Sequence, residues 1–127
     1  MIRAQYHIRQ VGAHTHIWEV RKLLARAAPL PILDVPLTDI AEIDEPYWFG
    51  ATGDAATCRA VMAHAAQAHG TDLSFPILLC AGGRVMDGMH RVMKAVALGH
   101  PTIRARRLPV TPPPDHIDVS LSDLPYE

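Results

Sequence analysis

The sequence has few cysteines, little net charge and no long apolar run, and each shortage excludes a class of protein. Its two cysteines, Cys58 and Cys80, show neither CxxC spacing nor a zinc-finger pattern, so no disulfide framework or structural metal is predicted. A formal net charge of −1 gives no basic field for nucleic acid. No stretch approaches the ~18 apolar residues of a membrane span, and the start of the chain lacks the apolar core of a signal peptide. We therefore expect a soluble, cytoplasmic protein with reduced thiols.

The 127 residues do contain an alternation of short apolar runs and helical patterns, which predicts a single α+β domain. An N-terminal helix is expected from Thr15, as the N-cap, to the stop at Pro29. Two further helices are expected over 56–70 and 89–98. The residues predicted to face the core are Ile17, Val20, Leu24 and Ala27 in the first helix, Val61, Ala65 and Ala68 in the second, and Val92, Ala95, Val96 and Leu98 in the third.

The predicted sheet is small and mixed. Its strands are expected near 33–37, 75–80, 84–87 and 102–108, and the uninterrupted apolar run before Gly82 indicates a strand covered on both faces. The turn "AGG" predicts a hairpin between the second and third of these strands. We expect a helical segment over 1–31, a core over 32–108, and a proline-rich acidic tail over 109–127. The tail is expected to pack loosely or to dock a partner.

The stretch "VMDGMHR", residues 85–91, carries the most chemical information. A turn at Asp87 and Gly88 leads into a helix whose first turn contains His90 and Arg91. A helix N-terminus is partly positive and has N–H groups without partners, so basic side chains there oppose the dipole unless an anion joins them. We therefore predict a phosphate site at Gly88, Met89, His90 and Arg91. The alternative is that Asp87 caps the helix while His90 and Arg91 point to solvent.

Basic residues are concentrated around this stretch. Segment 84–107 contains Arg84, Arg91, Lys94, Arg104, Arg106 and Arg107 against the single acid Asp87. Such a cluster is equally compatible with a patch that attracts phosphate and with a solvated basic face.

The run "PILLCAGGRVMDGMHRVMKAVALGHPTIRARRL" resembles the nucleotide-binding core of the ParB/sulfiredoxin superfamily, whose members carry a Gly-x-x-Arg box at a helix start. The resemblance covers roughly residues 32–108 and implies a ParB/sulfiredoxin-like fold. The box is most similar to that of the free-serine kinases of this superfamily, which have Asp-Gly-His-x-Arg or Asp-Gly-His-His-Arg and an upstream glutamate as general base. Asp87, Gly88, His90 and Arg91 match this box, and Met89 departs from its first histidine. This resemblance implies catalytic roles for Asp87 and His90, with Glu45 or Asp44 as the base.

Two departures exclude other members of the superfamily. Met89 stands where sulfiredoxins have their catalytic cysteine, and a thioether cannot act as a thiolate nucleophile. Only a proline-rich acidic tail follows residue 108, where chromosome-partition ParB proteins have a helix-turn-helix. Neither sulfinic-acid reduction nor centromere binding is expected.

Several functional hypotheses remain. The first is a nucleotide-binding phosphotransferase acting on a small hydroxyl substrate, or a nucleotide hydrolase, using ADP, ATP or CTP with or without Mg²⁺. The alternative is a non-catalytic nucleotide-sensing or protein-interaction module. DNA binding or nuclease action is disfavoured by the net charge. We expect no membrane partner, and a homodimer is left open.

Aromatic and histidine residues give weaker indications. Tyr47, Trp48 and Phe49 either stack on a nucleobase or anchor their loop in the core. His14 and His16 are two residues apart and would not share a helix face, so we predict no metal site.

Overall fold

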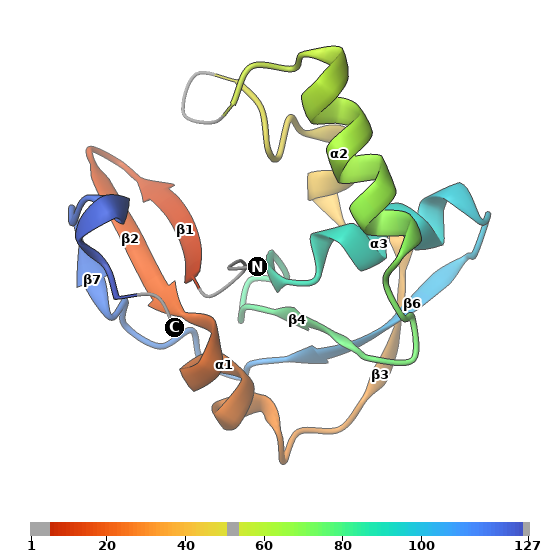
Figure 1. Cartoon of the computed structure of the whole chain (residues 1–127). Coiled ribbons are helices and arrows are strands. Elements are labelled where there is room, and N and C mark those ends of the chain that lie inside the picture. The colour runs from red at the N-terminus through yellow and green to blue at the C-terminus, as the bar shows by residue number, and fades with distance from the viewer. Residues whose placement is uncertain (1–5, 51–53, 126–127) are drawn as a thin grey trace.

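A computed structural model describes residues 6–50 and 54–125 and confirms the α+β prediction. The described residues form two sheets (Figure 1). The first contains β1 (Tyr6–Val11), β2 (His14–Glu19) and β7 (His116–Ile117). The second has the order β3 (Leu33–Pro36), β6 (Thr102–Arg107), β4 (Ile77–Leu79) and β5 (Val85–Asp87). The helices are α1 (Val20–Ala27), α2 (Cys58–His69) and α3 (Met89–Ala97), with short 3₁₀ turns η1 (Leu37–Asp39), η2 (Ala41–Asp44) and η3 (Leu121–Asp123).

Strand β4 lies inside the four-stranded sheet and is buried on both faces, as predicted. It pairs in parallel with β6 and antiparallel with β5, and the predicted hairpin closes with a bond from Cys80 N–H to the carbonyl of Arg84. Because strand side chains alternate, Ile77 and Leu79 join one hydrophobic cluster while Leu78 and Cys80 join the other. Two core layers therefore meet at this strand.

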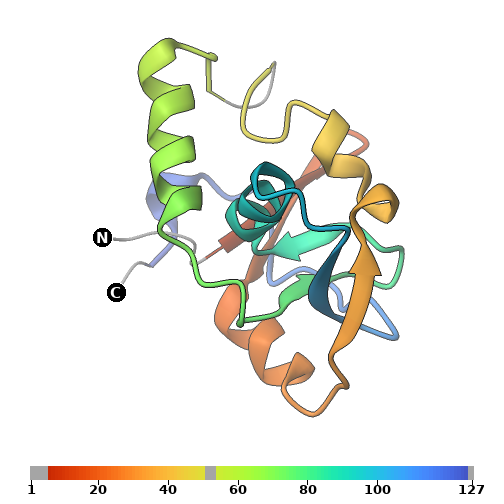
Figure 2. The same cartoon turned by 90° about the vertical axis from the view of Figure 1, so that its right-hand side faces the viewer.

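Helices α1 and α3 cover opposite faces of this sheet (Figure 2). Val92 and Ala95 of α3 are fully buried in the first cluster, and Leu23 and Ala27 of α1 are buried in the second. Helix α2 packs beside α3, with Ala68 as its buried residue. None of the described helices has the length and apolar character that a bilayer-spanning helix needs.

Three residues of α2 and α3 that were predicted to face the core are exposed, so this part of the prediction is wrong. Val61 of α2 is 43% exposed, and Val96 and Leu98 at the end of α3 are 45% and 58% exposed. Each lies on the outer side of its helix, away from the contact between α2 and α3 and from the contact of α3 with the sheet. The apolar pattern therefore overstated how much of these helices is covered.

The predicted start of the N-terminal helix at Thr15 is also wrong, because residues 14–19 form β2 and α1 begins only at Val20. Aromatic and β-branched side chains favour a strand here, and β2 has partners on both edges, β1 and β7. One of these partners comes from the far end of the sequence, which local periodicity cannot reveal. Leu24, expected in the core, is 46% exposed.

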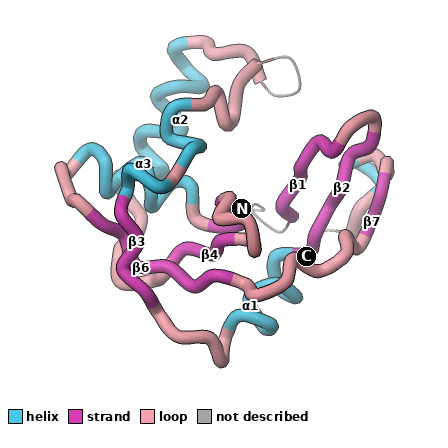
Figure 3. The backbone as a smooth tube through the Cα atoms, turned by 180° about the vertical axis from the view of Figure 1, so that it is seen from behind, coloured by secondary structure: helices cyan, strands magenta, loops and turns pink. Residues whose placement is uncertain are grey.

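The tail is not loosely packed. Figure 3 shows β7 running beside β2, and the amide of Asp115 donates to the carbonyl of Ile17 at 2.8 Å. The indole N–H of Trp18 donates to the carbonyl of Pro112 at 2.9 Å, and Leu124 is buried. These bonds join the C-terminal residues to the core rather than leaving them as an arm.

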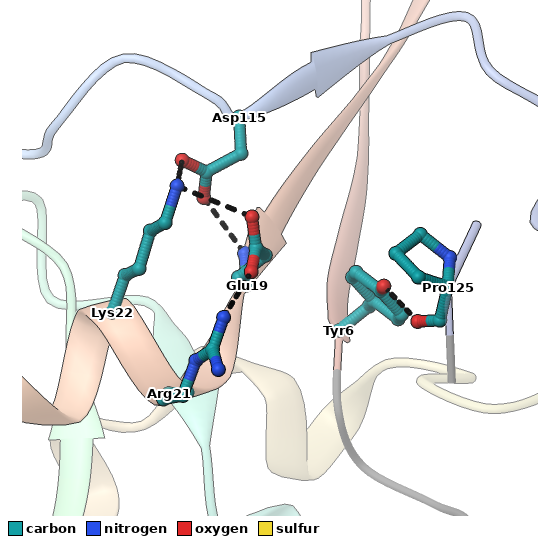
Figure 4. A network of polar contacts seen from close by, with 6 residues as sticks. All are labelled: Tyr6, Glu19, Arg21, Lys22, Asp115 and Pro125. Atoms are coloured by element: carbon teal, nitrogen blue, oxygen red, sulfur yellow. Dashed lines mark hydrogen bonds and ion pairs between the residues drawn. The ribbon is translucent and has the colours of Figure 1, made fainter. Parts of the chain in front are cut away.

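A polar network fastens this segment to the start of α1 (Figure 4). The carboxylate of Asp115 accepts from the backbone N–H of Glu19 at 2.8 Å and from Lys22 Nζ at 3.3 Å. Lys22 also lies 3.2 Å from the Glu19 carboxylate, and the Tyr6 hydroxyl donates to the carbonyl of Pro125. Both ends of the described chain are thereby held at the three-stranded sheet.

Candidate functional site

A cavity of about 1220 Å³ lies between the three-stranded sheet and the junction of β5 with α3. Most of its lining comes from β1, the loop containing Tyr47 and Trp48, residues 86–91 and residues 118–121, and single residues are added by other segments: Thr15, Val20, Asp54, Gln67 and Thr71. The four residues of the predicted phosphate site therefore share one cavity with Asp87. Asp44 and Glu45 are not among the residues that line it.

Gly88 is the N-cap of α3 and explains why the turn has this shape. Its φ of 103° lies in the left-handed region, which other residues adopt only under strain. A Cβ at this position would lie 2.7 Å from Ile77 Cγ2 and 2.8 Å from Arg91 Nη2. The helix start is therefore capped by Gly88 rather than Asp87, and the residues of its first turn line the cavity.

Arg91 does not point to solvent. Its Nη2 donates to Asp87 Oδ2 at 2.9 Å and its Nη1 donates to the carbonyl of Phe75 at 3.3 Å, leaving the side chain 17% exposed. A guanidinium has five N–H donors, so these two bonds fix its position beside Gly88 while leaving donors for a ligand. Asp87 acts here as an orienting group for Arg91.

His90 is paired with a residue that the sequence did not single out. Its Nε2 lies 2.8 Å from Nδ1 of His64, whereas the ring centroids are 5.0 Å apart and the planes differ by 17°. Since the facing nitrogens are much closer than the ring centres, the imidazoles meet edge to edge. Both lie on the indole of Trp48, at centroid distances of 4.1 and 4.5 Å. No sequence spacing marks His64, which lies on α2, as a partner of His90.

The two acids proposed as general base lie elsewhere. Both oxygens of Glu45 accept from Arg84, at 2.9 and 2.6 Å, and this bonding lowers the pKa of Glu45. Asp44 is exposed at the end of η2. The acid buried in this region is Glu42, whose Oε2 accepts from the backbone N–H of Val85 at 2.6 Å. Glu42 holds η2 against β5, a role that nothing in the sequence distinguishes from that of its acidic neighbours.

Most of the basic segment is occupied by contacts within the protein. Arg84 binds Glu45, and Lys94 donates to the carbonyls of His69 and Thr71 at 3.0 and 2.6 Å. Arg106 and Arg107 donate to the carbonyls of Leu30 and Ala81. These side chains anchor loops, so the concentration of charge along the sequence does not become a patch of unpaired cations.

Two buried groups in the cavity wall stay neutral at physiological pH. Burial, aided by the charge of Arg9, lowers the pKa of His7 to about 4. Burial and then the charge of Glu42 raise the pKa of Tyr47 to about 12, so its hydroxyl remains a donor. Each packs against the ring of a tryptophan, His7 on Trp18 and Tyr47 edge-on to Trp48.

His14 and His16 lie on a strand rather than a helix, so they do share a face, contrary to the reasoning from the sequence. His14 is paired with Asp118 at 2.6 Å and His16 lies beside Trp18. Over residues 6–50 and 54–125, no three histidine, cysteine or acidic side chains are grouped so that they could hold a metal ion.

Searches against protein-family models, curated proteins and solved structures found no match. The interpretation of the cavity therefore depends on its own residues.

Proposed function

We propose that this protein binds a nucleotide in the cavity at the start of α3. The phosphates would lie against the backbone of residues 88–91, where a glycine N-cap, first-turn N–H groups and Arg91 come together. The observation that carries the proposal is that this helix start opens into the same cavity as Tyr47 and Trp48, so that a base would contact aromatic side chains beside the His64 and His90 rings that stack on Trp48. The resemblance of residues 32–108 to the ParB/sulfiredoxin superfamily supports the same ligand class.

We favour nucleotide binding without a phosphoryl transfer in which Glu45 acts as the general base. A general base must come within hydrogen-bond reach of the proton that it removes. Both oxygens of Glu45 are instead held by Arg84, and neither Glu45 nor Asp44 lines the cavity. We therefore favour a nucleotide-sensing module over a kinase of a small hydroxyl substrate.

A thermal-shift panel of ADP, ATP and CTP, each with and without Mg²⁺, tests the proposal. A ligand that binds only the native state adds about 2.7 kcal/mol of stability at a hundred times its Kd, which is readily seen as a rise in melting temperature. At least one nucleotide should stabilise the protein. No shift with any of them would overturn the proposal.

Arg91→Lys tests whether the nucleotide binds at the predicted place. Lysine keeps the charge but loses the fork of donors, so the nucleotide affinity should fall by about 1–3 kcal/mol. Arg104→Ala is the matched control, because Arg104 is exposed on β6 and does not line the cavity. Affinities are compared by calorimetry on folded protein, since Arg91 also contributes to stability through Asp87. Equal losses in both variants would place the phosphate elsewhere.

A further inference from the structure

The hydrogen bond between His64 and His90 limits the charge that the two rings can carry. A bond between two ring nitrogens contains one proton, because one nitrogen donates and the other accepts. The pair at 2.8 Å therefore exists with both rings neutral or with one of them as imidazolium. A second added proton would set N–H against N–H and break the bond. While intact, the pair carries zero or one positive charge.

The cavity that His90 lines has more acidic than basic side chains. The charged residues that line the cavity are three acids, Asp54, Asp87 and Asp118, and one base, Arg91. Arg91 is already paired with Asp87 at 2.9 Å, and Lys94 of α3 is directed to backbone carbonyls. Tyr47, on the neighbouring loop, stays protonated. An incoming anion thus finds one arginine that is already paired with an acid, and the histidine pair is a second group at the start of α3 that can supply a positive charge.

Without a ligand, burial favours the neutral form of the His64 ring. Burial lowers the pKa of His64, and the carboxylate of Asp54 opposes this effect. An anion next to His90 would act in the same direction as Asp54, because a nearby negative charge favours imidazolium over imidazole. The rings are held in register for this change by the indole of Trp48.

We propose that His64 and His90 together take up one proton when a phosphate or sulfate group binds at the start of α3. The inference rests on the proposed function, because it requires an anion at residues 88–91. Binding of such a group becomes weaker as the pH rises from the titration midpoint of the free pair to the higher midpoint of the anion-bound pair, and within this interval the Kd increases by up to about tenfold per pH unit. The site is thereby a proton-coupled anion site.

Nitrogen-15 NMR of protein labelled in histidine reads the protonation of each ring directly. The titration is run between about pH 4 and pH 8, where imidazole changes its charge, in sodium chloride and in sodium sulfate of equal ionic strength. Sulfate is the probe because it remains a dianion over this range. His64 and His90 should respond together in one step, and sulfate should raise the midpoint of that step by at least about 0.5 pH unit.

Two variants separate pairing from a general effect on histidine. In His64→Gln, His90 should titrate without a coupled partner, and the Kd for sulfate should lose most of its dependence on pH. His69→Gln is the matched control, because His69 is an exposed histidine on the same helix and does not line the cavity. This control should keep both the joint step and the pH dependence.

The outcomes also distinguish this inference from the proposed function. Two independent steps for His64 and His90 would overturn the shared proton. A joint step with the same midpoint in chloride and sulfate, in protein that ADP still stabilises, would overturn the coupling and leave the nucleotide site standing. If sulfate leaves the midpoint unchanged and none of ADP, ATP and CTP raises the melting temperature, both proposals fail.

Discussion

Gly88 occupies a position at which both the backbone and the neighbouring side chains exclude a larger residue. Its φ of 103° costs other residues about 1–3 kcal/mol, and a Cβ would overlap Ile77 and Arg91. Gly88→Ala should therefore lower the free energy of unfolding by at least this amount and displace Arg91, so that nucleotide affinity also falls. Urea denaturation and calorimetry measure the two effects.

Gly82→Ala is the matched control for Gly88→Ala. Gly82 does not have a positive φ, and the nearest atom to its added Cβ would be Cys80 Sγ at an ordinary 3.8 Å. Its substitution should change stability by no more than about 0.5 kcal/mol. Equal behaviour of the two variants would mean that the turn at Asp87 and Gly88 does not have the described conformation.

Glu45 gives a second prediction at the scale of the residue. If Arg84 rather than a substrate is its partner, Glu45→Gln should leave nucleotide affinity and any nucleotide turnover unchanged within error. A phosphotransfer mechanism with Glu45 as base predicts a loss of turnover by about 10²–10⁴ instead. Steady-state assays of ADP release from ATP with the wild type and the variant distinguish the two, and a loss of that size would restore the kinase hypothesis.

At the scale of the element, α1 is part of the main core although it belongs to the N-terminal segment. Leu23 is 1% exposed beneath the four-stranded sheet, whereas Leu24 next to it is 46% exposed. Leu23→Ala should lower the free energy of unfolding by about 2–5 kcal/mol, and Leu24→Ala by no more than about 0.5 kcal/mol. Chemical denaturation of the two variants provides the comparison, and similar losses would contradict the packing of α1.

The four strands of the predicted mixed sheet are present as β3, β4, β5 and β6, whereas the three-stranded sheet, including the local hairpin of β1 and β2, was not predicted from the sequence. The hairpin of β4 and β5 and the helix α2, with Thr57 accepting from the N–H of Ala60, depend on local signals. The first half of the predicted N-terminal helix is β2 instead, which pairs along its whole length with β1 and at two residues with β7. The pairing with β7 comes from the other end of the chain, so local periodicity could not reveal it. The same limit applies to the site. The box at 87–91 was visible as a motif, but only the packing of α2 against α3 brings His64 to His90.

At the scale of the whole molecule, His7 links stability to pH. It is buried with no partner for Nε2 among the described residues, and burial lowers its pKa to about 4 from 6.5. Between these values the unfolded chain binds a proton that the folded protein does not, so stability falls as the pH falls. From pH 7 to pH 5 the free energy of unfolding should decrease by about 2 kcal/mol from this group.

Urea denaturation at pH 7, 6 and 5 measures this dependence, above the range in which most carboxylates titrate. His7→Leu removes the titrating ring and should flatten the profile, whatever its effect on stability at pH 7. A profile of unchanged slope in this variant would assign the dependence to other groups.

The pairing of β2 with β7 also constrains how the chain folds during its synthesis. The hairpin of β1 and β2 is local, but its third strand and the carbonyl of Pro112 that accepts from Trp18 lie about a hundred residues further along. A ribosome therefore exposes Trp18 and the edge of β2 long before their partners have been translated. Contacts between such distant residues slow folding, because a long loop must close before they form. Until then that edge and that indole are exposed on the nascent chain, where a chaperone could bind them.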